Sequence, residues 1–278
     1  RSRTRSASSS VTDSAAGATA LACGVRTYNG ALGVYMYDPL NTESHPKNIT
    51  ELCEENGMMT GIVTTDLTSG ATPGGFSVHT FARTNTWDID AQQMASDFDL
   101  IWGGTSDYIS KETCEENGFT FVKTYSEMMA LEEGTRSFAQ FDNNTWTDEQ
   151  VDAETPTLSQ MATKAIDLLD DTDEGFFLMI EGAHIDKHSH SNYNDTKKTL
   201  NMERALIEFD TTVNVALNFA KNDGHTLVVV TADHETGGLT LDQNGNYAFT
   251  DGYHTAADVP VFVYGSDKII ANGETVNN

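Results

Sequence analysis

Basic side chains are scarce in this sequence. It contains 16 Lys and Arg against 42 Asp and Glu, a formal net charge of −26 over 278 residues with His counted as neutral. Such an acidic chain is not expected to bind the nucleic-acid backbone in general, because that binding requires clustered Lys and Arg. The charge also argues against docking on anionic lipid. It is typical of a heavily solvated surface, although acidic side chains also bind metal ions.

Long hydrophobic runs are missing as well. No stretch approaches the roughly 18 apolar residues that a membrane-spanning helix needs, and no charged-then-apolar signal opens the chain. With 38% hydrophobic and 9% aromatic residues the composition is still that of a globular protein. No convincing linker interrupts it, so we expect residues 1–278 to form one domain with a substantial core.

Cysteine is rare, with three residues in the chain. Three are too few for a disulfide framework, and their spacing fits no zinc motif. Cys53 and Cys114 both open the string Cys-Glu-Glu-Asn-Gly. We interpret each string as a helix end closed by a glycine, Gly57 or Gly118, and followed by a strand. A single bridge between Cys53 and Cys114 in an oxidising compartment stays open as the alternative.

Short apolar runs predict buried strands, and most of them are continuous rather than alternating, as in strands covered on both faces. The runs are Gly61–Thr65, Leu100–Trp102, Phe119–Val122, Phe176–Ile180, Leu227–Thr231 and Val261–Tyr264. Apolar residues at helical spacing predict helices over 158–169 and 206–220. The repeated order of helix and strand predicts an α/β fold, with a mostly parallel central sheet sandwiched by helices.

Four other segments are predicted to be irregular. Residues 24–51 and 132–156 have the character of long connections, and residues 1–10 run into a helix start without a preceding strand. Residues 272–278 form a polar turn after the last apolar run. Two interpretations of the chain ends stay open: they are natural tails, or they are cuts through a larger domain.

The strongest chemical signal follows the predicted strand Phe176–Ile180. Glu181 ends this strand, Asp186 follows five residues later and His190 four residues after that. If a helical turn begins there, Asp186 and His190 share one face. A carboxylate and an imidazole together are suited to Zn²⁺.

A second predicted strand ends in the same kind of residue. Asp233 and His234 follow Leu227–Thr231, and His254 lies further along the chain. Ligands gather outside the carboxyl ends of strands in open α/β sheets. We therefore expect these three residues to join Asp186 and His190 in one metal site.

A third signal combines a serine and an arginine. Ser14 precedes a run of small residues, so its hydroxyl is expected at the positive N-terminus of a close-packed helix. A serine beside a metal there can act as a nucleophile. The planar fork of Arg83 suits two phosphate oxygens. Taken alone, Ser14 is an ordinary helix cap and Arg83 a solvated charge.

In chain order these motifs resemble the alkaline phosphatase family, and the resemblance covers nearly the whole chain. The matching segments are Thr12–Ala20, Thr27–Gly33, Thr60–Thr65, Ala71–Pro73, Glu181–His190, Thr231–His234 and His254–Pro260. The resemblance implies that Ser14 is the phosphorylated nucleophile. It also implies that Arg83, oriented by Asp13, holds the phosphate oxygens, and that Lys187 lies near the phosphate through water.

The resemblance further implies two zinc ions and one magnesium ion. The implied ligands are Asp186, His190 and His254 for the first zinc, Asp233 and His234 for the second, and Thr72 and Glu181 for magnesium. The expected activity is hydrolysis of small phosphate monoesters to inorganic phosphate through a phosphoserine. A homodimer in the periplasm or outside the cell is expected on the same basis. The alternatives are a phosphodiesterase or sulfatase-like hydrolase, and a non-catalytic fragment that binds metal or phosphate.

Three departures from the family pattern stand out. The family has an Asp on an N-terminal strand that bridges the second zinc and magnesium, and it has further structure at the C-terminus. Neither is found here, so we expect a chain truncated at both ends, with weakened metal binding and low activity. Gly70 stands where many members have an Asp or His that touches magnesium through water, which implies a weaker magnesium site.

Overall fold

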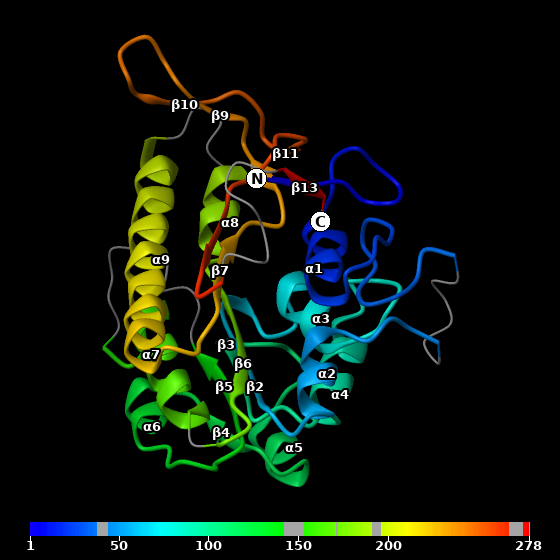
Figure 1. Cartoon of the computed structure of the whole chain (residues 1–278), viewed down its shortest axis with the longest axis vertical. Coiled ribbons are helices and arrows are strands. Elements are labelled where there is room, and N and C mark those ends of the chain that lie inside the picture. Colours follow the sequence, from blue (N-terminus) through cyan, green and yellow to red (C-terminus); the bar gives the residue numbers. More distant parts are fainter. Residues whose placement is uncertain (38–43, 142–152, 171, 191–195, 267–274, 278) are drawn as a thin grey trace.

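The main sheet has five strands that run parallel to one another. The computed structural model describes residues 1–37, 44–141, 153–170, 172–190, 196–266 and 275–277. The strand order is β4-β5-β3-β2-β6, and every pairing is parallel (Figure 1). The strands are β2 (Met59–Leu67), β3 (Leu100–Gly104), β4 (Thr120–Val122), β5 (Ser137–Phe141) and β6 (Phe176–Glu181). The predicted α/β fold with a mostly parallel central sheet is confirmed.

Helices cover both faces of this sheet. Figure 1 shows α7 and α9 on one side and α1 to α4 on the other. The helices are α1 (Ser14–Cys23), α2 (Ile49–Glu54), α3 (Ala71–Ser77), α4 (Thr86–Met94), α5 (Lys111–Glu116), α6 (Tyr125–Met129), α7 (Leu158–Leu169), α8 (His184–His190) and α9 (Thr196–Asp223). The two helices predicted from apolar spacing are confirmed, the second as part of the longer α9.

The core is split into two layers because successive strand residues face opposite ways. Val63 and Trp102 pack against the apolar stripe of α7, whereas Ile62 and Ile101 pack toward α1 and α3. All four side chains are fully buried, and each stabilises the fold by about 2 kcal/mol. This double cover explains why the strand sequences are continuously apolar.

The last two predicted strands form but do not join the main sheet. β7 (Val228–Thr231) and β12 (Val261–Tyr264) pair antiparallel with each other, and the residues described place neither beside β6. Val229 is 50% exposed and Phe262 is 64% exposed. The prediction that these runs are buried strands is therefore wrong. A four-residue apolar run does not distinguish a central strand from one that is covered on a single face.

The segment 132–156, predicted to be irregular, contains the buried strand β5. Its sequence, Ser-Phe-Ala-Gln-Phe, includes two buried polar residues, Ser137 and Gln140. Ser137 Oγ accepts a hydrogen bond of 3.0 Å from Nε1 of Trp102. Such polar residues hide the strand in a hydrophobicity pattern, although they are satisfied inside the sheet.

The chain ends also carry short strands that the sequence analysis did not predict. β1 (Ser2–Arg3) pairs in parallel with β13 (Val276–Asn277), so neither end is wholly irregular. Between β7 and β12 lie the short strands β8 (Glu235–Thr236), β9 (Leu239–Leu241), β10 (Tyr247–Phe249) and β11 (His254–Thr255). The pair β8–β11 places His254 next to the residues that follow β7.

The two Cys-Glu-Glu-Asn-Gly strings do end helices. Gly57 and Gly118 have φ angles of 77° and 81°, in the left-handed region that favours glycine, and β2 and β4 follow shortly after. Cys53 and Cys114 are free thiols rather than partners in a bridge. The interpretation as two similar helix ends is confirmed.

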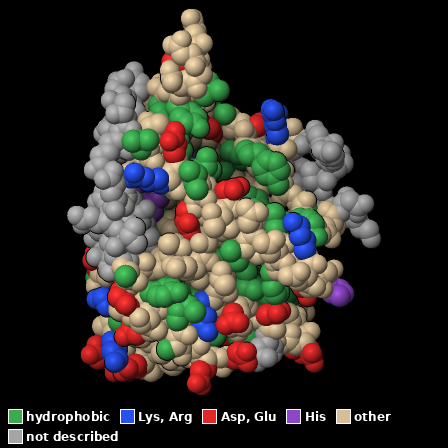
Figure 2. Space-filling view, turned by 90° about the vertical axis from the view of Figure 1, so that its left-hand side faces the viewer, with side chains coloured by type: hydrophobic (Ala, Val, Ile, Leu, Met, Phe, Trp, Pro, Cys, Tyr) green, Lys and Arg blue, Asp and Glu red, His purple; other side chains and the backbone are tan. Residues whose placement is uncertain are grey.

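The surface agrees with the acidic composition. Figure 2 views the left-hand side of Figure 1 and shows Asp and Glu side chains gathered mainly along the lower part of that face, with several Lys and Arg side chains between and above them. In the part of the chain that the structure describes, no helix has both the length and the apolar character needed to cross a bilayer.

Candidate functional site

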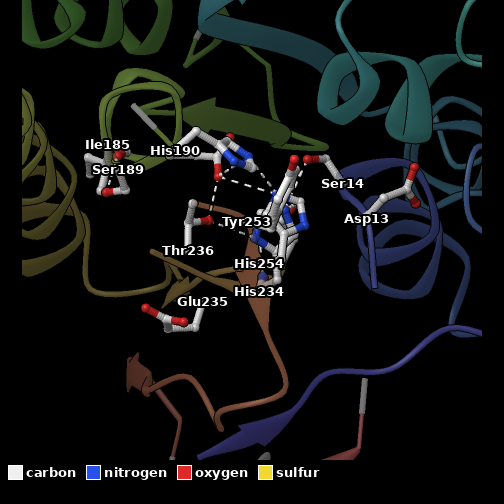
Figure 3. A network of polar contacts seen from close by, with 12 residues as sticks. Asp13, Ser14, Ile185, Ser189, His190, His234, Glu235, Thr236, Tyr253 and His254 are labelled. Atoms are coloured by element: carbon white, nitrogen blue, oxygen red, sulfur yellow. Dashed lines mark hydrogen bonds and ion pairs between the residues drawn. The ribbon is translucent and has the colours of Figure 1, made fainter. Parts of the chain in front are cut away.

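The residues singled out in the sequence come from several elements near the carboxyl edge of the main sheet. Glu181 is the last residue of β6, and Thr72 lies in the first turn of α3, which follows β2. The others stand at the start of α1 (Asp13, Ser14), beyond α3 (Arg83), in α8 (Asp186, Lys187, His190), after β7 (Asp233, His234) and in β11 (His254). Figure 3 shows part of this network, with Ser14 and three histidines turned toward one another.

Asp186, His190 and His254 form a compact cluster. Oδ1 of Asp186 lies 3.3 Å from Nε2 of His190 and 3.5 Å from Nε2 of His254, and the two Nε2 atoms are 2.9 Å apart. The predicted helical turn is present as α8, which places Asp186 and His190 on one face. The ligand atoms of the three residues all lie within 4.8 Å of one another, close enough to hold one metal ion.

The backbone orients the two imidazoles of this cluster. Nδ1 of His254 lies 2.9 Å from the carbonyl oxygen of Thr12, and Nδ1 of His190 lies 3.0 Å from that of Gly252. A carbonyl can only accept, so each Nδ1 carries the proton. Nε2 faces Asp186, so it donates to that carboxylate when the ring is protonated and offers its lone pair to a metal ion when the ring is neutral. This outer support is typical of histidines that bind a metal.

His234 joins this cluster to the serine. Its buried ring places Nε2 3.0 Å from Oγ of Ser14 and 3.2 Å from Oδ2 of Asp233. On the other edge, Nδ1 lies 3.2 Å from Oγ1 of Thr236. The ring stacks on His254 with centroids 3.4 Å apart (Figure 3). The residues that follow β6 and those that follow β7, which were predicted to converge, do lie together.

Ser14 is the first residue of α1. Asp13 caps this helix, because its Oδ1 accepts a 3.0 Å hydrogen bond from the backbone N–H of Ala16. A Cβ atom added at Gly17 would lie 2.9 Å from Cβ of Asp233. The glycine therefore lets the chain beyond β7 approach the first turn of the helix. Small residues were expected to pack this helix closely, and they do.

Arg83 reaches the site through Asp13. Its Nη1 donates to Oδ2 of Asp13 at 3.1 Å, and the same oxygen accepts from the backbone N–H of Gly30 at 2.9 Å. The backbone N–H of Arg83 also donates to the carbonyl of Gly30 at 2.7 Å. The side chain of Arg83 remains 36% exposed, so its guanidinium is anchored yet accessible to an anion.

Glu181 lies among oxygen atoms. It accepts hydrogen bonds from the hydroxyls of Thr64 and Thr72. Burial, followed by the charges of Asp66 and Asp233, raises the pKa of Glu181 to about 8 despite these bonds. An oxygen-only group that is short of positive charge is suited to Mg²⁺.

Asp186 has the opposite environment. Burial raises its pKa, but hydrogen bonds from His254 and Thr236 and the charges of His234 and His190 outweigh burial and bring it down to about 2. Burial lowers the pKa of His254, and the hydrogen bond with Asp186 more than compensates, so that pKa is raised. One carboxylate with three imidazoles that turn Nε2 inward is the donor chemistry of zinc.

Three contributing residues were missed in the sequence. Asp66 accepts from Nζ of Lys187, Thr236 donates to Asp186, and Thr64 donates to Glu181. Asp66 could have been found, because it lies near the carboxyl end of a predicted strand, as Glu181 does. The hydroxyls carry no comparable signal, since Thr is common in strands.

A second group of metal-type side chains, His45, Glu51 and His79, is separate from this site. Nε2 of His79 lies 3.2 Å from Glu51, and its Nδ1 lies 2.6 Å from the carbonyl of Gly33. The rings of His45 and His79 stack with centroids 3.4 Å apart. The ligand atoms of this group also lie within 4.8 Å of one another, but none of the predicted site residues belongs to it. We interpret the group as a contact between His79 and Glu51 that the ring of His45 covers.

A surface groove between α6, α7 and α9 also lies apart from the candidate residues. Its lining includes Tyr125, Lys164 and Phe219, and none of the predicted site residues contributes to it. The candidate site at the carboxyl edge of the sheet is therefore separate from this groove.

Known proteins match both the sequence and the fold. The family model described as alkaline phosphatase matches residues 1–251. Alkaline phosphatase 4 of Bacillus subtilis is 33% identical over 247 residues, which cover 84% of this chain and 51% of the relative. Alkaline phosphatase of Escherichia coli is 30% identical over 282 residues, covering 81% of this chain and 58% of the relative. The chain thus spans about half the length of these curated relatives.

Solved structures agree. Alkaline phosphatase from the Antarctic bacterium TAB5 superposes with a TM-score of 0.77 at 32% identity, covering 95% of this chain and 80% of that one. The cold-active enzyme of a Shewanella species has a TM-score of 0.85 at 25% identity, covering 100% of this chain and 85% of that one. The sequence match and the shared fold together show that the chain belongs to the alkaline phosphatase family.

Proposed function

We propose that this protein hydrolyses phosphate monoesters through a phosphoserine on Ser14, at a site that holds two zinc ions and one magnesium ion. One observation carries the proposal. Oγ of Ser14, at the start of α1, lies 3.0 Å from Nε2 of His234, which stacks on the cluster of Asp186, His190 and His254. Family membership supports the same reaction.

The donor chemistry supports the proposed metals. Asp186, His190 and His254 would hold the first zinc, Asp233 and His234 the second, and Thr72 and Glu181 magnesium. When bound, the ions supply Lewis-acid stabilisation of charge on the attacking and leaving oxygens. A solved variant of the TAB5 enzyme contains magnesium at a site called M3.

The chain's own residues bind and attack the substrate. Ser14 gives its proton to solvent, and its Oγ attacks phosphorus in line with the leaving group, which takes up a proton from solvent and departs as the alcohol while the phosphoserine forms. Water then breaks the bond between phosphorus and Oγ and releases inorganic phosphate. The N-terminus of α1 favours negative charge at Ser14. Arg83, held by Asp13, binds two phosphoryl oxygens and positions the group for attack.

The accessible fork of Arg83 favours monoesters over the diesterase alternative. The non-bridging oxygens of a phosphate monoester carry two negative charges, whereas those of a diester share one negative charge. The ratio of monoester to diester turnover tests this preference. A single domain, a homodimer and a periplasmic or extracellular location are further proposals that follow from family membership. Sedimentation of the purified protein tests the dimer.

The experiment is hydrolysis of 4-nitrophenyl phosphate at alkaline pH, with and without a chelator. We expect the chelator to abolish turnover and Ser14→Ala to lower kcat by at least about 10³-fold. The matched control is Ser110→Ala, which removes another serine at a helix start, the cap of α5. Chelator-resistant turnover, or full activity in Ser14→Ala, would contradict the proposed reaction. A protein that binds about one zinc and forms no phosphoserine would favour the non-catalytic alternative.

A further inference from the structure

An aspartate that belongs to no recognised motif holds the lysine of the site. Lys187 follows Asp186 in α8, and its Nζ donates to Oδ1 of Asp66 near the end of β2. β2 lies beside β6, with Thr64 opposite Glu181. The ion pair therefore connects α8, which carries zinc-type ligands, to the strand next to the magnesium-type group.

The carboxylate of Asp66 has a fixed orientation. Its Oδ1 also accepts a 2.7 Å hydrogen bond from the backbone N–H of Leu67. The side chain of Asp66 is 19% exposed, whereas that of Lys187 is 39% exposed. The aspartate is thus the more rigid partner, and the flexible lysine takes its position from it.

Gly70 leaves the room that this carboxylate occupies. A Cβ atom at Gly70 would lie 2.7 Å from Oδ2 of Asp66 and 2.9 Å from the carbonyl of Leu67. The φ angle of Gly70 is −58°, so the backbone does not require glycine there. The reason for glycine is space. A side chain at position 70 and the carboxylate of Asp66 would compete for the same volume.

The surrounding charge makes such anchoring necessary. Asp186 precedes the lysine in sequence. Glu181 is also near, because the charge of Asp66 contributes to the raised pKa of Glu181. An unanchored ammonium group has several carboxylates within reach of its long side chain. A fixed partner selects one position for the positive charge, which a phosphate dianion in this acidic site needs.

Building on the function proposed above, we propose that Asp66 is the positioning residue of Lys187, directing its ammonium group to the phosphoryl oxygens of substrate and product. Gly70 is the second half of this arrangement, because it leaves space for the Asp66 carboxylate.

The test is the affinity of the zinc- and magnesium-loaded protein for inorganic phosphate, measured by calorimetry. Asp66→Asn keeps the shape of the side chain and removes its charge, and we expect it to weaken phosphate binding about tenfold. We expect Lys187→Ala to weaken it by a similar factor, and Asp66→Asn to have no further effect in the Lys187→Ala background.

The matched control is Asp167→Asn, which breaks the ion pair of 3.2 Å between Lys164 and Asp167 in α7 and should leave affinity unchanged. With 4-nitrophenyl phosphate, Asp66→Asn should raise KM more than it lowers kcat. Equal phosphate affinity in Asp66→Asn and wild type would overturn the role of Asp66. The same conclusion would follow if the effects of Asp66→Asn and Lys187→Ala multiplied in the variant that carries both changes. Persistent turnover in Ser14→Ala would instead overturn the proposed reaction, so the two failures are distinguishable.

Discussion

Two regions of the site differ in how they treat a carboxylate. Glu181, at the end of β6, has its pKa raised to about 8, whereas Asp186, five residues later in α8, has its pKa lowered to about 2. Burial acts in the same direction on both. The neighbours make the difference, since Glu181 faces the carboxylates of Asp66 and Asp233 and Asp186 lies among imidazoles. For Glu181, burial is the largest cause and the two carboxylates add to it, whereas for Asp186 the hydrogen bonds and imidazole charges outweigh burial.

The contrast indicates what each region needs from a metal ion. The imidazoles around Asp186 already compensate part of its negative charge, and borderline donors of this kind select zinc. The group around Glu181 consists of oxygen atoms and excess negative charge, which a small, hard cation would neutralise. Four changes can break or sharpen this comparison.

The largest effect is expected at the imidazole cluster. Asp186→Asn removes the charge shared by His190 and His254, so one zinc per chain should be lost and kcat/KM should fall about 10³-fold. Metal content by mass spectrometry and steady-state kinetics measure both. Asp210→Asn, on the exposed surface of α9, is the control. Normal zinc content in Asp186→Asn would show that the cluster is structural.

At the other region, magnesium binding should depend on pH. The carboxyl of Glu181 must lose its proton to bind a cation, and with a pKa of about 8 it does so between pH 7 and pH 9. We expect about tenfold tighter magnesium binding at pH 9 than at pH 7, with release of a proton. Calorimetry in buffers of different ionisation enthalpy measures this release. A similar pH dependence in Glu181→Gln would assign the proton to another group.

Without metal, Glu181 should destabilise the fold as pH rises. Its folded pKa of about 8 exceeds its ordinary value of 4.5, so its contribution to stability is complete below pH 4.5 and is lost as pH rises through 8. The metal-free protein should therefore unfold at lower urea concentration at pH 9 than at pH 6. Glu181→Gln should reduce that difference. A difference of the same size in the variant would contradict the assignment.

The smallest effect concerns Asp186 in acid. Its folded pKa of about 2 lies below its ordinary value of 3.8, so its stabilisation is complete above pH 3.8 and is lost as pH falls through 2. Allowing for screening of a side chain that is 33% exposed, we expect a contribution of about 1 kcal/mol. Urea unfolding of metal-free wild type and Asp186→Asn from pH 5 to pH 2 measures it. Parallel stability curves for the two proteins would argue against this contribution.

Much of the architecture was predictable because it depends on local pattern. Continuous apolar runs identified β2, β3, β4 and β6, and the double Cys-Glu-Glu-Asn-Gly string identified two helix ends. β5 escaped because Ser137 and Gln140 are polar yet satisfied inside the sheet. The exposure of β7 and β12 was missed because a short apolar run contains no information on how many of its faces are covered.

The candidate site was predictable to the extent that its residues follow strands. Asp186, Asp233 and His234 were identified by that rule, and the structure brings them together with Ser14 and His254. The contacts that orient them were not predictable. Backbone carbonyls fix two of the imidazoles, and a carbonyl is present at every residue, so no sequence signal marks the two that are used.

The sequence by itself determined the α/β class, the helix ends and most of the candidate side chains for metal and phosphate, since these depend on composition and spacing along the chain. Only the tertiary structure decided which carboxylate faces imidazoles and which faces other carboxylates, and that Asp66 fills the space beside Gly70. The physical reason is that pKa, ion pairing and steric room depend on distances between residues that are far apart in the chain. Those distances are set only when the strands and helices pack.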